Sequence, residues 1–188
     1  KITYERGSRR DSRDLNKLSD TEIANFRGKS EWEKRHGRRI LQERAANGKL
    51  TPGLGNALEE DLKNWLLVTG APPEVAKRVQ LHVLWTLSAI GELSERRLLE
   101  AMYTVFDNDS VRCQAILLAV ESRSPSRELL EGLRKFADKD YSPHWHSSQF
   151  ERLHLASALQ RIPLDDRWPI ADALLDRKST RLNSSHRT

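Results

Sequence analysis

The chain has 188 residues, of which 32 are lysine or arginine and 27 are aspartate or glutamate, so its formal net charge at pH 7 is +5. This length suffices for one domain with a continuous core. No apolar run approaches the roughly 20 residues that a membrane-spanning helix needs. The single cysteine, Cys113, excludes an internal disulfide and a multi-cysteine zinc or haem motif. We interpret Cys113 as a small buried residue rather than a nucleophile, because nothing places a base beside it.

The last thirteen residues differ from the rest of the chain. Residues 176–186 read DRKSTRLNSSH, which resembles the translation, in one frame, of a common sequencing adapter over every codon. We therefore expect residues 176–188 to be a non-native disordered tail, and the chain to be a gene fragment open at both ends. The alternative is a natural serine-rich basic tail. The tail holds four basic residues and one acidic residue, so the net charge without it is +2, and most of the basicity that would suggest nucleic acid disappears.

Two capping boxes mark the first helices of the chain. Ser19 stands three residues before Glu22, and Ser30 stands three residues before Glu33. In this motif each serine and each glutamate bonds the backbone N–H group of the other, which satisfies donors that a helix start leaves free. Before these boxes, residues 1–14 have the pattern of a strand end followed by a charged linker.

Glycine and proline separate the later helices. Gly70 ends a helix that Pro52 opens, and Pro125 takes the first helical position of another, where its missing N–H group costs nothing. Apolar residues recur at helical spacing, and no stretch beyond Tyr4 has the two-residue period of a strand. We therefore predict an all-α fold of short antiparallel helix pairs. The predicted pairs are 19–28 with 31–47, 52–69 with 72–90, 94–106 with 109–121, and 125–137 with 147–162, and a helix over 165–175 begins a fifth pair.

Four of these helices carry an arginine at a similar place. Each arginine precedes a small or apolar pair by about five residues, and successive arginines are 43, 34 and 40 residues apart. This interval is the period of HEAT-type helix-pair repeats, in which each unit buries its apolar stripe against its neighbours. We predict a right-handed α-solenoid of HEAT-like repeats over residues 15–175. The repeated arginines are Arg35, Arg78, Arg112 and Arg152.

Two pairs of aspartates stand at equivalent junctions between helices: Asp107 with Asp109, and Asp138 with Asp140. A carboxylate there accepts backbone N–H bonds at the next helix start and suits its dipole. We predict that these aspartates pair with the repeated arginines and form a structural ladder that ties the units together. The alternatives are a general acid–base pair and an arginine-lined inner face that grips phosphate or an acidic partner.

The histidine and tryptophan residues offer weaker signals. His144 and His146 form a His-x-His motif that a metal ion can use in a loop. No third ligand is indicated nearby, so we favour a polar loop and expect no metal. We expect the five tryptophans to be mostly core anchors, with Trp145 as the exposed one. The tryptophans are Trp32, Trp65, Trp85, Trp145 and Trp168.

Three segments resemble parts of one protein family. Residues 155–171, LASALQRIPLDDRWPIA, resemble the end of the helical-repeat region of large haem-binding dehydrogenase-like proteins of the planctomycete and verrucomicrobial group. Residues 35–45, RHGRRILQERA, resemble the start of that region, and residues 14–20, DLNKLSD, resemble the segment leading into it. The resemblance covers about residues 1–175. In that family a β-propeller resembling sugar dehydrogenases precedes the repeats, and a c-type cytochrome domain with a Cys-x-x-Cys-His motif follows.

The resemblance implies a division of the chain into three parts. Residues 1–14 would be the end of the propeller and a linker, residues 15–175 the solenoid, and residues 176–188 the non-native tail. The chain contains neither a whole propeller nor Cys-x-x-Cys-His. We therefore expect no enzyme activity and no cofactor in it, whatever oxidoreductase activity the larger protein has.

The sequence thus predicts a non-catalytic scaffold that spaces or docks the flanking propeller and cytochrome c domains. The resemblance implies a periplasmic or cell-envelope location, and we expect the uncovered ends of the solenoid to self-associate. One alternative is a nucleic-acid-binding HEAT-like protein that uses the arginine ladder on its concave face. A net charge near +2 disfavours it, so nucleic acid is not the expected partner. Another alternative is an enzyme with a site on the concave face.

Overall fold

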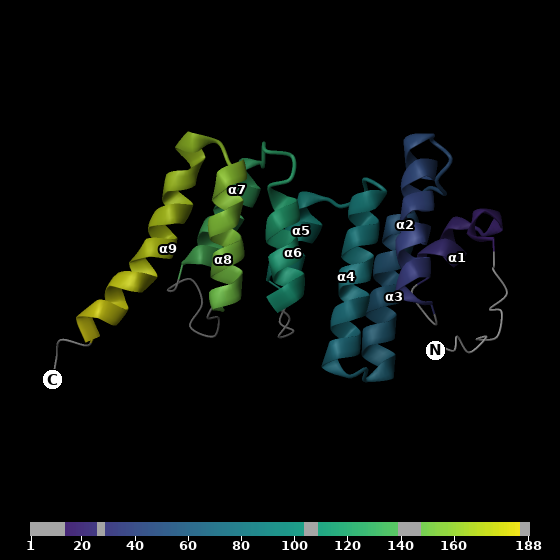
Figure 1. Ribbon diagram of the computed structural model, residues 1–188, viewed down its shortest axis with the longest axis horizontal. Helices are drawn as coiled ribbons and strands as arrows, with labels where there is room; N and C mark the ends of the chain where they lie inside the picture. Colours follow the sequence, from purple (N-terminus) through teal and green to yellow (C-terminus); the bar gives the residue numbers. More distant parts are fainter. Residues whose placement is uncertain (1–13, 26–28, 104–108, 139–147, 185–188) are drawn as a thin grey trace, which may run out of the picture.

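The computed structural model describes residues 14–25, 29–103, 109–138 and 148–184, with side chains as far as residue 175. These residues contain helices and no strand, so the predicted all-α class is confirmed for them. The helices follow one another in chain order along the long axis, from α1 at one end to α9 at the other (Figure 1). The α-helices are α1 (Asp20–Ala24), α2 (Glu31–Ala46), α3 (Leu54–Thr69), α4 (Pro73–Ala89), α5 (Glu95–Met102), α6 (Asp109–Ala119), α7 (Arg127–Ala137), α8 (Gln149–Ala158) and α9 (Leu164–Ser184), with short 3-10 helices at Leu15–Lys17 and Leu159–Arg161.

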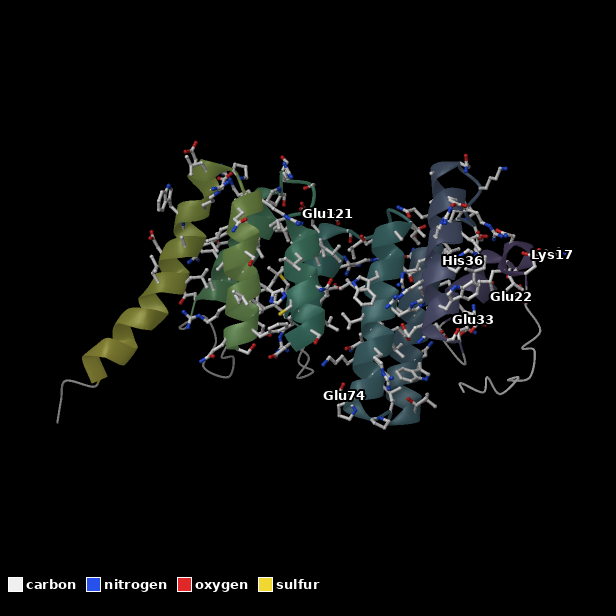
Figure 2. All side chains as sticks on the ribbon, in the orientation of Figure 1. Lys17, Glu22, Glu33, His36, Glu74 and Glu121 are labelled. Carbon is white, nitrogen blue, oxygen red and sulfur yellow. The ribbon has the colours of Figure 1, made fainter. Side chains whose placement is uncertain are left out.

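The two predicted capping boxes are present. Ser19 and Glu22 cap α1, and Ser30 and Glu33 cap α2, with both reciprocal bonds formed in each box. Glu22 and Glu33 lie at these helix starts in Figure 2. The serine and the glutamate thus satisfy donors that the first turn cannot pair.

Several helix ends differ from the prediction. Gly53 caps α3 in a left-handed conformation, so that helix starts at Leu54 rather than near Pro52. Ser126 caps α7 by accepting a bond from the Leu129 N–H, which leaves Pro125 outside the helix. The last helix, α9, runs on to Ser184 instead of ending near residue 175. The segment predicted as a strand end, residues 1–4, lies outside the described residues.

Successive helices pack as pairs, and the pairs pack against one another. Within pairs, α1 contacts α2, α3 contacts α4 and α5 contacts α6. Between pairs, the second helices form an unbroken series in which α2 contacts α4, α4 contacts α6 and α6 contacts α8. The fourth predicted pair differs, because α7 makes few contacts with its predicted partner α8 and packs mainly against α9. No helix in the described part is both long and apolar enough to cross a membrane.

The buried apolar residues form two clusters that meet on α4. One cluster fills the space among α1 to α4, with Leu41 and Leu54 fully buried. The other extends from α4 to α9, with Phe136 and Ile170 fully buried. Helix α4 contributes Val79, Val83 and Leu87 to the first cluster and Leu84 to the second. Its two sides therefore belong to different cores.

A buried carboxylate ties the start of the fold to α2 and to the connection between α2 and α3. Asp20 is 4% exposed and accepts bonds from Arg44 (Nη1–Oδ1, 2.6 Å), from the Thr51 backbone N–H (2.6 Å) and from the Thr51 hydroxyl (2.7 Å). Arg44 also donates to the carbonyls of Leu18 and Asn16. Burial alone raises the pKa of Asp20, but the bonds from Arg44 and Thr51 outweigh burial and hold it below its ordinary value.

Candidate functional site

All four repeated arginines lie near the starts of second helices, on α2, α4, α6 and α8. Their environments nevertheless differ. Arg35 and Arg78 are exposed, Arg112 is 6% exposed, and Arg152 is intermediate. The Nε group of Arg78 bonds the carbonyl of Glu74 on its own helix (3.3 Å). The sequence register therefore places these residues on equivalent helices without giving their side chains equivalent roles.

Arg112 joins α6 to α8 through a buried ion pair. Its Nε group bonds Glu151, which is fully buried on α8, and its Nη2 group bonds Asp109 at the start of α6 (2.6 Å). The other carboxylate oxygen of Glu151 accepts the Ser148 N–H (2.7 Å) and completes a capping box. One carboxylate thus both caps α8 and neutralises a buried arginine. Sequence reasoning missed Glu151, although Ser148 three residues earlier gives the capping-box signal.

Arg152, the last of the four repeated arginines, has a different environment from Arg112. Its Nη2 group donates to the carbonyl of Leu174 on α9 (3.0 Å), and its buried Nε group has no hydrogen-bond partner. No carboxylate in the described part of the chain pairs with it. Asp138 lies near Arg134 instead (Nη1–Oδ2, 3.8 Å). The remaining predicted residues, Asp107, Asp140, His144 and His146, lie outside the described residues.

A second row of polar contacts crosses the second helices, and the arginine register did not indicate it. Arg38 on α2 donates to Nδ1 of His82 on α4 (3.0 Å), and its guanidinium lies 5.4 Å from the ring centroid of Trp85. Trp85 in turn donates to the side-chain oxygen of Gln114 on α6 (3.2 Å). These contacts link three successive second helices. Arg38 is one helical turn after Arg35, on a part of α2 that turns toward α4.

His82 is held neutral by this arrangement. It is 4% exposed, and burial, reinforced by the charge of Arg38, lowers its pKa to about 4. Its Nδ1 accepts from Arg38, so Nε2 carries the proton and faces the carbonyl of Ala24 (3.4 Å). Because both ring nitrogens are engaged in this way, His82 links α1, α2 and α4. It is not placed to act as a general acid.

Cys113 has the environment of a structural residue. The thiol is 1% exposed, and burial, together with the nearby carboxylates of Glu151 and Asp109, raises its pKa to about 12. The nucleophile in cysteine chemistry is the thiolate, so this thiol is poorly suited to catalysis. The described residues also contain no group of three or more histidine, cysteine or acidic side chains positioned to hold a metal ion.

Helix α9 presents an apolar stripe to solvent. Leu164, Trp168 and Leu175 are 62%, 63% and 63% exposed, and they recur at helical spacing on one face. The opposite face, with Ile170, belongs to the core. The expectation that the tryptophans other than Trp145 would be core anchors is therefore wrong for Trp168, and also for Trp32, which is 66% exposed and stacks on His36 (5.0 Å between ring centroids). Trp145 lies outside the described residues.

Comparison of the chain with protein-family models, curated proteins and solved structures gives no match.

Proposed function

We propose that this chain is a binding scaffold, a right-handed α-solenoid of HEAT-like helix pairs that holds other protein domains through its apolar surfaces. The observation that carries the proposal is the exposed stripe of Leu164, Trp168 and Leu175 on α9. An exposed apolar stripe on a structured helix is typical of a protein interface. The unbroken series of contacts between second helices supports a stacked arrangement.

The resemblance to the helical-repeat region of haem-binding dehydrogenase-like proteins supplies the partners. By that resemblance the scaffold spaces a β-propeller from a c-type cytochrome domain, in the periplasm or cell envelope. The chain itself takes no part in the chemistry. Residues 155–171, one of the segments that resemble this family, include Leu164 and Trp168 of the exposed stripe.

Binding to separately produced domains tests this proposal. A propeller domain and a cytochrome c domain from a dehydrogenase-like protein of that group are titrated into the chain in a calorimeter. We expect one of them to bind, and Trp168→Glu to weaken binding by about thirtyfold, the effect of losing one interface hot spot. Trp32→Glu is the matched control, because it changes an equally exposed tryptophan at the other end of the molecule. Failure of both domains to bind, or equal effects of the two variants, would overturn the proposal.

Self-association of the chain is a second test of whether the stripe on α9 is an interaction surface. An uncovered apolar surface tends to bury itself against another copy. We expect sedimentation analysis to show a concentration-dependent increase in mass that Trp168→Glu abolishes. A chain that remains monomeric at all concentrations would contradict the assignment of this stripe as an interaction surface.

A nucleic-acid-binding role is the alternative. It needs arginines free to meet phosphates, and Arg35 and Arg78 are exposed. Against it, Arg112 is buried and paired with Glu151 and Asp109. A mobility-shift titration with single- and double-stranded DNA and RNA at two salt concentrations separates the alternatives, since binding that weakens steeply with salt would favour nucleic acid.

A further inference from the structure

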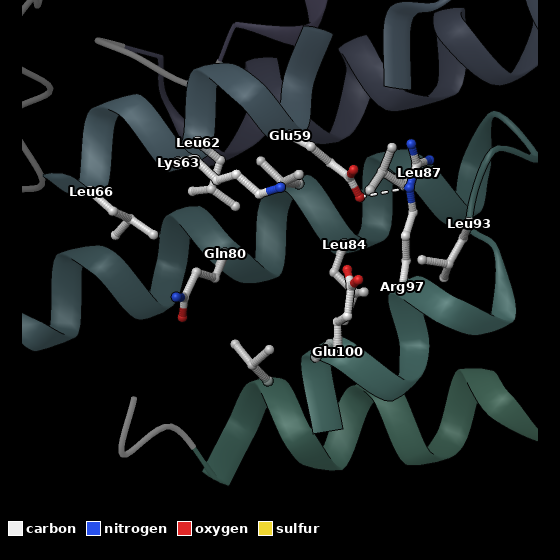
Figure 3. A pocket seen from close by; sticks show the side chains of 13 residues that line it. Glu59, Leu62, Lys63, Leu66, Gln80, Leu84, Leu87, Leu93, Arg97 and Glu100 are labelled. Carbon is white, nitrogen blue, oxygen red and sulfur yellow. Dashed lines mark ion pairs between the residues drawn. The ribbon is translucent and has the colours of Figure 1, made fainter. Parts of the chain in front are cut away.

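A cleft with a cavity volume of about 300 Å³ is lined by residues of α3, α4 and α5 (Figure 3). Its origin is a difference in helix length. Helix α3 has 16 residues and α5 has 8, so they extend about 24 Å and 12 Å at 1.5 Å per residue. The start of α3 is tied to α5, where Arg97 pairs with Glu59 (Nε–Oε1, 2.7 Å) and bonds Asn56 (2.6 Å). The second half of α3 extends past the end of α5 and leaves the cleft open.

The walls of the cleft are mainly aliphatic. Leu62 and Leu66 come from α3, Leu84 and Leu87 come from α4, and Leu93 comes from the connection before α5. The two core clusters meet here, because Leu84 belongs to one, Leu87 belongs to the other, and Leu93 packs against both. An aliphatic ligand placed here would continue the core instead of lying on a polar surface.

The charges at the rim leave one cation without a partner. Glu59 is neutralised by Arg97, and Glu100 is neutralised by Arg96 on the same helix. Lys63 lines the cleft, as Figure 3 shows, and forms no ion pair among the described residues. The cleft therefore complements an aliphatic body that carries a single negative charge.

We propose that this cleft binds a medium-chain aliphatic carboxylate, with its chain on the leucines and its carboxylate group at the ammonium group of Lys63. At about 30 Å³ for each water-sized group, the volume accommodates about ten methylene-sized groups, the length of decanoate. Mostly apolar cavities with few polar groups are the usual form of small-molecule sites in proteins. This inference is independent of the scaffold proposal, because the stripe on α9 contributes nothing to the cleft.

Decanoate binding to the whole chain tests this inference. Sodium decanoate, below the concentration at which it forms micelles, is titrated into the chain and followed through the leucine methyl resonances. Decanol and decyltrimethylammonium, which share the aliphatic chain but not the negative charge, serve as comparison ligands. We expect saturable shifts centred on Leu62, Leu66 and Leu84, with decanoate the tightest of the three ligands. Affinity should rise about two- to fourfold per methylene from butyrate to decanoate, the fold-change that corresponds to burying a methylene wholly or in part.

Variants at the rim distinguish specific binding in the cleft from nonspecific hydrophobic binding elsewhere on the protein. Lys63→Met should weaken decanoate by up to about fivefold, the upper end of the range for an exposed ion pair, and leave decanol unchanged. Lys49→Met is the matched control, since Lys49 is exposed and does not line the cleft. Leu66→Gln should weaken all three ligands. Equal binding of the three ligands, absence of saturable shifts, or identical effects of the two lysine variants would overturn the proposal.

Discussion

Replacing Arg112 with methionine should destabilise the fold strongly. The substitution keeps an unbranched side chain but removes the cation that faces Glu151, whose side chain is 1% exposed. A buried carboxylate that loses its partner costs about 3 to 5 kcal/mol, and Glu151 cannot turn to water without giving up its bond from the Ser148 N–H. Since a domain is stable by about 5 to 15 kcal/mol, we expect a loss near 3 kcal/mol to be a large fraction of the total.

Urea denaturation followed by far-ultraviolet circular dichroism measures this loss. Arg39→Ala is the control, because Arg39 pairs with Glu43 on the exposed side of α2, and such a pair contributes less than about 1 kcal/mol. Glu151→Gln alone should also be costly, because it leaves Arg112 buried without a countercharge. The double variant Arg112→Met with Glu151→Gln should lose much less than the sum of the two single losses. Strictly additive losses, or an effect of Arg112→Met no larger than that of Arg39→Ala, would refute the reasoning.

Other features give predictions of their own. Asp20→Asn should cost about 2 kcal/mol at pH 7, the value of bonds to a buried charge. Because the pKa of Asp20 lies below its ordinary 3.8, the difference from wild type should shrink as the pH falls below that value, and a constant difference in urea titrations would contradict this. His82 has a pKa of about 4 against an ordinary 6.5, so the unfolded chain binds more protons between these values, and stability should fall as the pH drops from 6.5 to 4. If NMR spectra showed the His82 imidazole titrating near pH 6.5 in the folded protein, this prediction would be wrong. Deleting residues 176–188 should leave the melting temperature unchanged, and a clear drop in a calorimetric scan would show that the segment supports the fold.

Local signals in the sequence predicted the helices well. Ser19, Ser30 and Gly70 act through neighbours within a few residues, and such short-range chemistry can be read along the chain. The same reasoning failed at Pro125, because the competing hydroxyl of Ser126 formed the cap. Where two signals for one helix start lie next to each other, spacing alone does not decide between them.

The contacts between helices were predicted less well. The period of the arginines located second helices, but the rotation of each helix decides whether an arginine is buried like Arg112 or exposed like Arg78. The partner of Arg112 on α8 is 39 residues away, which is about one repeat. The period therefore gives the spacing of the contact, but it does not indicate that Glu151, rather than an aspartate at the helix junction, is the partner. The cleft depends on the unequal lengths of α3 and α5, and its shape follows from packing rather than from a motif.

The meeting of two cores on α4 has a mechanical consequence. Apart from α4 and Leu93, which contribute to both, the residues of each core come from helices on one side of α4. A small rotation of one group against the other would therefore leave most contacts within each core intact. Helix α4 would act as the hinge, and the space beside it, between α3 and α5, would widen or narrow with the angle. A molecule of this kind can change the distance between its ends at low cost. A ligand that fills the space beside α4 would fix the angle between the two groups of helices, and with it the distance between the ends of the molecule.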